Sequence, residues 1–169
     1  MRIFLIGFMG SGKTYWAKIL ADRLKLPLYD LDMEITNREQ RSIPEIFAKS
    51  GEEYFRTKER EILDDLIDKN DSMVLSCGGG TPCFLNNIEL MKKYGTVAWL
   101  NTHVDVLCQR LLKEKGQRPL LKNVDDHDLK SYIIRKLNER RMYYQQADVT
   151  IDNENSISVN YLVETILHA

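Results

Sequence analysis

The residues with the clearest chemistry lie near the start of the chain, where Gly7–Thr14 reads Gly-Phe-Met-Gly-Ser-Gly-Lys-Thr. This is the Gly-x-x-x-x-Gly-Lys-Thr spacing of a Walker A loop, and it follows an apolar β-prone run. Glycines let the backbone approach phosphates closely, and the N–H groups of Gly10, Gly12, Lys13 and Thr14 can form an anion-binding nest at a helix N-terminus. Lys13 would reach the β- and γ-phosphates, while the Thr14 hydroxyl would bind Mg²⁺. The segment therefore predicts a site for a nucleoside triphosphate and Mg²⁺.

Two aspartates, Asp30 and Asp32, follow the next β-prone run. In an open parallel sheet the carboxyl ends of strands face the ligand crevice. If the strand continues through both residues, its two-residue alternation places both carboxylates on one side. One could then hold Mg²⁺ through water, and the other could accept a proton or a hydrogen bond from a hydroxyl nucleophile. The alternative is that either aspartate caps the N-terminus of the next helix.

Three consecutive glycines, Gly78–Gly80, follow a third β-prone run within Ser76-Cys-Gly-Gly-Gly-Thr81. Glycines after a buried strand leave backbone N–H groups open to a close ligand. A plain tight turn rarely needs three of them, so the pattern favours contact with a ligand.

The arginines are ambiguous when each is considered alone. Arg56 follows Glu52 by four residues on a predicted helix, which is the spacing of a surface ion pair. Arg118 lies in Lys115–Asp128, a polar stretch with little periodicity that is typical of a loop, and loops of this length are often lids. Arg140 and Arg141 lie near the end of a predicted helix, where cations interact favourably with the helix dipole.

The elements that would position these residues alternate between β-prone and helical patterns. Strands are predicted at Ile3–Ile6, Leu28–Asp30, Met73–Ser76, Val97–Leu100 and Val149–Ile151. Helices are predicted near 13–25, 33–49, 52–69, 84–93, 103–115, 128–145 and 157–167, with Ser42-Ile-Pro-Glu45 reading as a capping box. Such alternation predicts an α/β fold with a parallel sheet covered by helices on both faces.

Length and composition exclude several classes of protein. The chain has 169 residues and no internal repeat or linker, so a single domain is expected. A net charge of −1 argues against wrapping nucleic acid, although 109–141 carries 10 basic and 5 acidic residues. No apolar run is long enough to span a membrane, and Gly7 and Gly10 end the first run too early for a signal peptide, so a cytoplasmic protein is expected. The three cysteines show no metal-ligand spacing. No apolar surface stretch suited to self-association is evident, so a monomer is expected.

Taken together, these motifs resemble those of shikimate kinases over nearly the whole chain. The matching residues are Gly7–Thr14, Asp30-Leu-Asp32, Gly51-Glu-Glu-Tyr-Phe-Arg56, Gly78–Gly80, Arg118-Pro-Leu-Leu121, and Arg140 with Tyr144 and Ala147. Many families share the first motif. The order of Gly-Glu-x-x-Phe-Arg, Gly-Gly-Gly and Arg-Pro-Leu-Leu is far more specific.

The resemblance implies a P-loop NTPase fold like that of nucleoside-monophosphate kinases, with a five-stranded parallel sheet, a substrate-binding region at about 31–60 and a mobile lid at about 113–127. The implied reaction transfers the γ-phosphoryl group of ATP, with Mg²⁺, to the 3-hydroxyl of shikimate in aromatic amino acid biosynthesis. The implied shikimate ligands are Asp32, Arg56, Gly78, Gly79, Gly80 and Arg140. The implied ATP ligands are Gly10, Ser11, Gly12, Lys13, Thr14, Tyr15, Arg110 and Arg118. Lys13, Asp30, Asp32 and Arg118 would take part in catalysis, and Thr14 and Asp30 would hold the metal.

The resemblance also implies roles around the adenine base. Arg110 resembles the arginine that lies against adenine, and Asp152–Asn155 would line the other side of the base.

Some points stay open on the sequence alone. The chain lacks the proline often found before Tyr144, and Arg141 competes with Arg140 as the substrate ligand. Either Asp30 or Asp32 could be the base, with Asp32 favoured for substrate contact and Asp30 for the metal.

A gluconate kinase or another P-loop small-molecule kinase would share the phosphate loop and the lid. A GTPase-like switch is disfavoured, because the sequence contains neither Asn-Lys-x-Asp nor Asp-x-x-Gly.

Overall fold

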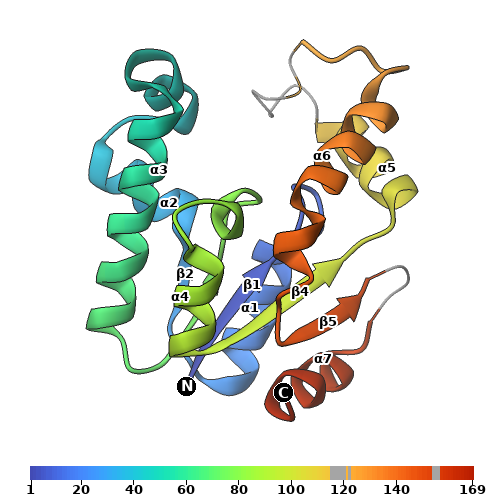
Figure 1. Cartoon of the computed structure of the whole chain (residues 1–169). Helices are drawn as coiled ribbons and strands as arrows, with labels where there is room; N and C mark the ends of the chain where they lie inside the picture. The colour runs from blue at the N-terminus through green and yellow to red at the C-terminus, as the bar shows by residue number, and fades with distance from the viewer. Residues whose placement is uncertain (115–120, 122, 154–156) are drawn as a thin grey trace.

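A five-stranded parallel sheet forms the centre of the molecule (Figure 1). The structure, a computed structural model, describes residues 1–114, 121, 123–153 and 157–169. The strands are β1 (Arg2–Ile6), β2 (Leu28–Asp30), β3 (Met73–Ser76), β4 (Thr96–Asn101) and β5 (Val149–Asp152), in the order β2-β3-β1-β4-β5. All five lie where the sequence predicted them, within one residue at each end. The predicted α/β class with a five-stranded parallel sheet is confirmed.

Helices cover both faces of the sheet. They are α1 (Lys13–Leu24), α2 (Leu31–Glu39), α3 (Ile43–Lys69), α4 (Asn87–Tyr94), α5 (Val104–Glu114), α6 (Leu129–Tyr144) and α7 (Val159–Leu167), with a short 3₁₀ turn, η1, at Thr81–Cys83. Alternate residues of β1 define the two faces. Ile3 and Leu5 pack with residues of α1 and α7, whereas Phe4 and Ile6 pack with residues of α3 and α4 and with Tyr144 of α6. The carboxyl ends of the strands are thus left open between the helices.

A third apolar cluster supports the tip of the phosphate loop. Phe8 packs there with residues of α5 and α6 and with Leu121. A side chain on Gly10 would come within 3.1 Å of Leu111, so the loop lies directly on this cluster. The predicted lid begins where α5 ends.

The predicted helix at 33–49 is wrong, because the chain forms two helices there. The Asp30 side chain accepts a hydrogen bond from the Met33 N–H, which starts α2 directly after β2. The predicted capping box is confirmed, since Ser42 and Glu45 cap each other and start α3. Gly51 then kinks α3 with φ 84° and ψ 171°, a conformation that side chains disfavour.

Within the described ranges, no helix is both long and apolar enough to cross a membrane.

Candidate active site

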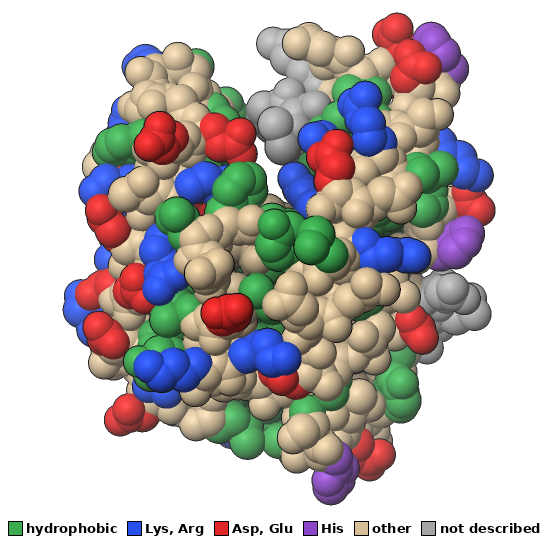
Figure 2. Space-filling view, viewed as in Figure 1, with side chains coloured by type: hydrophobic (Ala, Val, Ile, Leu, Met, Phe, Trp, Pro, Cys, Tyr) green, Lys and Arg blue, Asp and Glu red, His purple; other side chains and the backbone are tan. Residues whose placement is uncertain are grey.

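A pocket of about 1320 Å³ lies at the carboxyl ends of the strands. Figure 2 shows the molecule hollowed between α3 on the left and α6 on the right, above the sheet. Most of the residues predicted from the sequence line this pocket: Gly10, Gly12, Lys13, Thr14, Tyr15, Asp30, Asp32, Arg56, Gly78, Gly79, Gly80, Arg110 and Arg140. Arg118 lies outside the described residues. One wall thus belongs to the phosphate loop, and the facing wall carries arginines and carboxylates.

The loop after β1 has the backbone of an anion site. Gly10 and Gly12 have φ angles of 80° and 90°, and α1 begins at Lys13. The N–H groups at the start of a helix attract phosphate. Nζ of Lys13 donates to the carbonyls of Gly7 and Phe8, both at 2.9 Å, so the ammonium is held along the loop. The loop therefore presents donors and a cation to the same side of the pocket.

Three oxygen-bearing side chains meet beside this loop. The Thr14 hydroxyl donates to Oδ2 of Asp30 at 2.9 Å and lies 3.3 Å from Oγ of Ser76. Hydroxyl and carboxylate oxygens are the ligands that Mg²⁺ prefers, and Mg²⁺ keeps several of its waters when it binds. The donor set fits a magnesium ion held by Thr14 and Asp30 at the phosphates.

Asp32 lies in the first turn of α2 and not on the strand, so the predicted two-residue alternation with Asp30 is wrong. Both carboxylates still line the pocket, because the turn from β2 into α2 occurs at its wall. Asp32 is accessible to solvent through the open pocket, yet protein atoms surround most of its carboxyl group. This burial, with the negative charges of Asp30 and Glu59, raises its pKa to about 6, against the opposing effect of Lys13 and Arg56. A carboxylate with this pKa can accept a proton near neutral pH.

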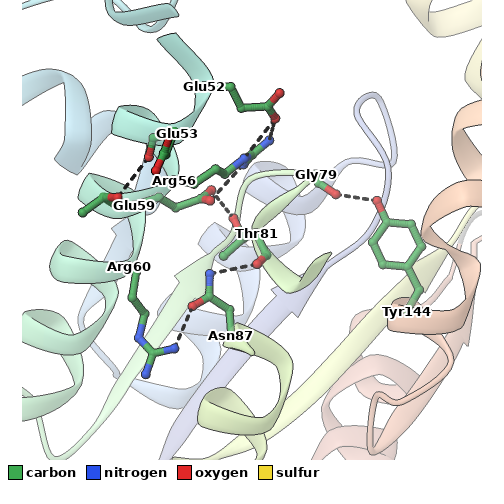
Figure 3. A network of polar contacts seen from close by, with 10 residues as sticks. Glu52, Glu53, Arg56, Glu59, Arg60, Gly79, Thr81, Asn87 and Tyr144 are labelled. Carbon is green, nitrogen blue, oxygen red and sulfur yellow. Dashed lines mark hydrogen bonds and ion pairs between the residues drawn. The ribbon is translucent and has the colours of Figure 1, made fainter. Parts of the chain in front are cut away.

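Arg56 is fixed by four neighbours, two of which, Glu52 and Glu59, are labelled in Figure 3. Nη1 donates to Oε2 of the buried Glu59 at 2.9 Å, and Nε and Nη2 lie 3.3 and 3.2 Å from Oε1 of the exposed Glu52. The guanidinium lies 4.0 Å from the ring centroid of Phe84 and against Gly80. The ion pair with Glu52 expected from the spacing is present, but Glu59 and Phe84 make Arg56 part of a fixed pocket wall.

The three glycines are needed because groups of the site lie against them. A side chain on Gly78 would come within 3.0 Å of Oδ1 of Asp32, and one on Gly80 within 2.7 Å of Nη2 of Arg56. At Gly79 the nearest atoms would be Nη1 of Arg140 at 3.2 Å and the N atom of Met9 at 3.4 Å. The segment thus lies between the phosphate loop and both arginines, which excludes a plain turn.

Arg140 and not Arg141 faces the pocket. Arg140 lies with its guanidinium 5.5 Å from the ring centroid of Phe8 and lines the pocket, whereas Arg141 is exposed and does not line it. Tyr144, one turn further along α6, is fully buried and donates a hydrogen bond of 2.6 Å to the Gly79 carbonyl. The last turn of α6 therefore contacts the glycine segment.

Arg110 and Asn153 line the pocket and contact the phosphate loop. Nη1 of Arg110 donates to the Gly10 carbonyl at 3.0 Å. Nδ2 of the buried Asn153, just after β5, donates to the Ser11 carbonyl at 2.8 Å. Of the predicted segment Asp152–Asn155, only Asp152 and Asn153 are among the described residues, and Asn153 lines the pocket.

Sequence reasoning missed Glu59, Ser76 and Phe84. Glu59 had a signal, since it follows Arg56 by three residues and so shares its helix face. Asn153 belongs to the predicted segment Asp152–Asn155, but its contact with Ser11 was not predicted, because it depends on the pairing of β4 with β5.

A phosphate loop on the central strand of a parallel sheet, facing a pocket with fixed arginines and a carboxylate of raised pKa, is the arrangement of a P-loop kinase for small acids. Comparison with known proteins gives the family. The family model described as Shikimate kinase matches residues 9–169. A shikimate kinase of Azobacteroides pseudotrichonymphae is 42% identical over 166 residues, which are 98% of this chain and 97% of the relative.

Solved structures agree. The crystal structure of a shikimate kinase from Bacteroides thetaiotaomicron has a TM-score of 0.89 at 37% identity, covering 99% of this chain and 97% of the other. A shikimate kinase from Acinetobacter baumannii in complex with shikimate has a TM-score of 0.86 at 34% identity, covering 99% and 90%. The chain belongs to the shikimate kinase family, and it is therefore an enzyme that transfers phosphoryl groups.

Proposed function

We propose that the chain transfers the γ-phosphoryl group of ATP to the 3-hydroxyl of shikimate, giving shikimate 3-phosphate and ADP. The observation that carries the proposal is the position of Gly79. It lies between the phosphate loop and Arg140, so the donor loop and the acceptor wall meet within one pocket. Membership of the family supports shikimate as the acceptor, in the aromatic biosynthesis that this reaction serves.

Arg56 and Arg140 would bind the carboxylate of shikimate. Planar guanidinium groups suit a carboxylate, and both line the pocket opposite the phosphate loop. Asp32 would accept a hydrogen bond from the 3-hydroxyl, and backbone N–H groups of Gly78–Gly80 would donate to the substrate. Glu59 accepts a hydrogen bond from Arg56, which keeps the guanidinium in place before the substrate binds.

The N–H groups of Gly10, Ser11, Gly12, Lys13 and Thr14 would bind the phosphates of ATP. Tyr15 and Arg110 would flank the nucleotide, and Arg118 would come from the lid to the phosphates. Thr14 and Asp30 would hold Mg²⁺, which neutralises phosphate charge when it is bound.

In the reaction, the 3-oxygen of shikimate forms a bond to the γ-phosphorus while the bond from that phosphorus to the β,γ-bridging oxygen breaks. The hydroxyl proton passes to Asp32, and ADP leaves with the bridging oxygen. Lys13 stabilises charge on the transferring group, with Arg118 as its partner. The chain's main contribution is to align the two oxygens and to exclude water, which would otherwise hydrolyse ATP.

The proposal includes the wider setting of the enzyme. Residues 1–169 would act as a single domain, with a substrate-binding region at about 31–60 and a lid at about 113–127. The chain would work as a monomer in the cytoplasm, with ATP and shikimate as its partners and without nucleic acid or membrane.

A coupled assay of ADP release tests the proposal, with ATP and Mg²⁺ and with shikimate, gluconate, AMP or CMP as the acceptor. Of these four acceptors, we expect only shikimate to give turnover. Lys13→Met should abolish it, because the variant loses the cation at the phosphates but keeps a side chain of similar length. Turnover with gluconate and none with shikimate would assign the pocket to a sugar acid instead.

A further inference from the structure

The glycine segment at the centre of the pocket is braced on two sides. On the α3 side, Oγ1 of Thr81 donates to Oε1 of Glu59 at 2.7 Å, and Nδ2 of Asn87 donates to the Thr81 carbonyl at 2.9 Å. On the α6 side, the Tyr144 hydroxyl donates to the Gly79 carbonyl at 2.6 Å. Figure 3 shows Tyr144 and Arg56 on opposite sides of Gly79.

The bond from Tyr144 fixes the plane of the peptide that joins Gly79 to Gly80. In a trans peptide the C=O and the next N–H point in opposite directions, and the described chain has no cis peptide. Because the Gly79 carbonyl points to α6, the Gly80 N–H points away from α6 and toward the side of Arg56. Gly80 is buried but is one of the residues that line the pocket, so its N–H lies at the pocket wall.

Glycine by itself would not keep this orientation. A peptide between two glycines has few steric limits on rotation, and it would sample several orientations at the edge of an open pocket. The hydroxyl that restrains it is well placed to do so. The Tyr144 side chain is fully buried, and its ring stacks on Trp99 of β4 with centroids 5.7 Å apart.

Tyr144 also connects this peptide to the arginine of the same helix. Arg140 precedes it by one turn of α6, and Nη1 of Arg140 lies close to Gly79. The last turn of α6 thus places two groups at the pocket. It carries the Arg140 guanidinium, and through Tyr144 it orients the Gly80 N–H. Both groups suit a carboxylate or a hydroxyl oxygen.

We propose that Tyr144 is a positioning residue, whose hydroxyl holds the Gly79–Gly80 peptide so that the Gly80 N–H faces the acceptor substrate. The inference rests on the proposed function, because it takes shikimate as that substrate. It predicts an effect on the acceptor half of the pocket, with the nucleotide half unchanged.

Tyr144→Phe tests this, since the variant keeps the buried ring and removes only the hydroxyl. We expect the KM for shikimate to rise about three- to tenfold, the range for loss of one neutral hydrogen bond, with the KM for ATP unchanged. Tyr143→Phe is the matched control, because it removes a hydroxyl from the neighbouring residue, which does not line the pocket. It should behave like the wild type.

Amide NMR gives a second readout. Adding shikimate to the wild-type chain should shift the Gly80 N–H signal strongly, and the shift should be reduced in Tyr144→Phe. An unchanged KM for shikimate, or a rise in both KM values together with a lower melting temperature, would overturn the positioning role. A wild-type chain without turnover of shikimate would overturn the proposed function and this inference with it, whereas normal wild-type turnover beside an unaltered variant would overturn only the role of Tyr144.

Discussion

The Thr14 hydroxyl donates a 2.9 Å hydrogen bond to Oδ2 of Asp30, which ties the end of the phosphate loop to the end of β2. Asp30 also caps α2 through its other oxygen. One carboxylate therefore combines two roles that the sequence offered as alternatives. It begins a helix, and it accepts a hydrogen bond from the hydroxyl with which we propose that it holds Mg²⁺.

Asp30→Asn should weaken the use of Mg²⁺ without unfolding the chain, because asparagine caps helices as well as aspartate does. We expect the Mg²⁺ concentration for half-maximal rate to rise about tenfold, as is usual when a group near a bound metal is lost. The measurement is a Mg²⁺ titration at fixed ATP. Asp22→Asn, on the exposed side of α1, is the control. Equal Mg²⁺ requirements in the two variants would remove Asp30 from the metal site.

Arg140→Ala should raise the KM for shikimate about 10- to 100-fold, the range for a lost charged hydrogen bond, with nucleotide binding nearly intact. Arg141→Ala is the matched control, since it removes the same charge from the next residue, which is exposed. Steady-state kinetics with each substrate varied would measure both effects. If the two variants lost shikimate affinity equally, general attraction by positive charge would explain the effect better than a contact by Arg140.

Asp32 should give the activity an acid limb with a pKa of about 6 in the plot of kcat/KM for shikimate against pH. Below that pH the carboxyl group is protonated and cannot accept the hydroxyl proton, so the rate should fall. The profile can be measured from pH 5 to 8.5. A rate that stays constant down to pH 5 would contradict the role of Asp32 as base.

The same pKa shift predicts that Asp32 costs the protein stability when it is ionised. Between the usual pKa of 3.8 and about 6, the folded chain binds the proton more tightly than the unfolded chain. The contribution of Asp32 to stability therefore falls as the pH rises through this window, and the full cost is present above it. Asp32→Asn should raise the melting temperature at pH 7.5 by about 2–4 °C, from a gain on the order of 1 kcal/mol after screening by pocket water. Greater stability with lost activity is the expected pair of results, and a lower melting temperature would refute the electrostatic explanation.

Gly80→Ala should act through Arg56. The new methyl group would lie 2.7 Å from Nη2, so the guanidinium must move from its place between Glu59 and Phe84. We expect a higher KM for shikimate and an unchanged KM for ATP. In an Arg56→Ala background the same substitution should have no further effect, because the group that it displaces is gone. Additive effects in the double variant would show that the methyl group disturbs the pocket in another way.

Local patterns predicted the position of the phosphate loop between β1 and α1 well. The Walker A spacing carries its own structure, because glycines, lysine and helix N-terminus are consecutive in the chain. The strands were also predicted closely, since buried parallel strands read as short apolar runs. The division between α2 and α3 was missed because helical periodicity continues across residues 40–42, although the capping box at Ser42 marked the correct start.

The pocket wall that faces the phosphate loop depends on contacts between distant segments of the chain. Arg56 was predicted to form a surface ion pair with Glu52, four residues before it on the helix. Its place in the pocket comes from Phe84 and Gly80, which lie on a different segment of the chain. The resemblance to the family supplied what local spacing could not, and the structure adds Glu59 and Tyr144 as the groups that fix the arrangement.

A Cβ atom added to Gly79 would lie 3.4 Å from the N atom of Met9 and 3.5 Å from the carbonyl oxygen of Gly7, so the glycine segment packs closely against the main chain of the phosphate loop. The separation between the glycine segment and the phosphate loop is therefore set by the main chain and by the pairing of β1 with β3. Side chains elsewhere in the protein can drift in evolution without altering that separation. We therefore expect the same separation in relatives that share about two fifths of their residues with this chain.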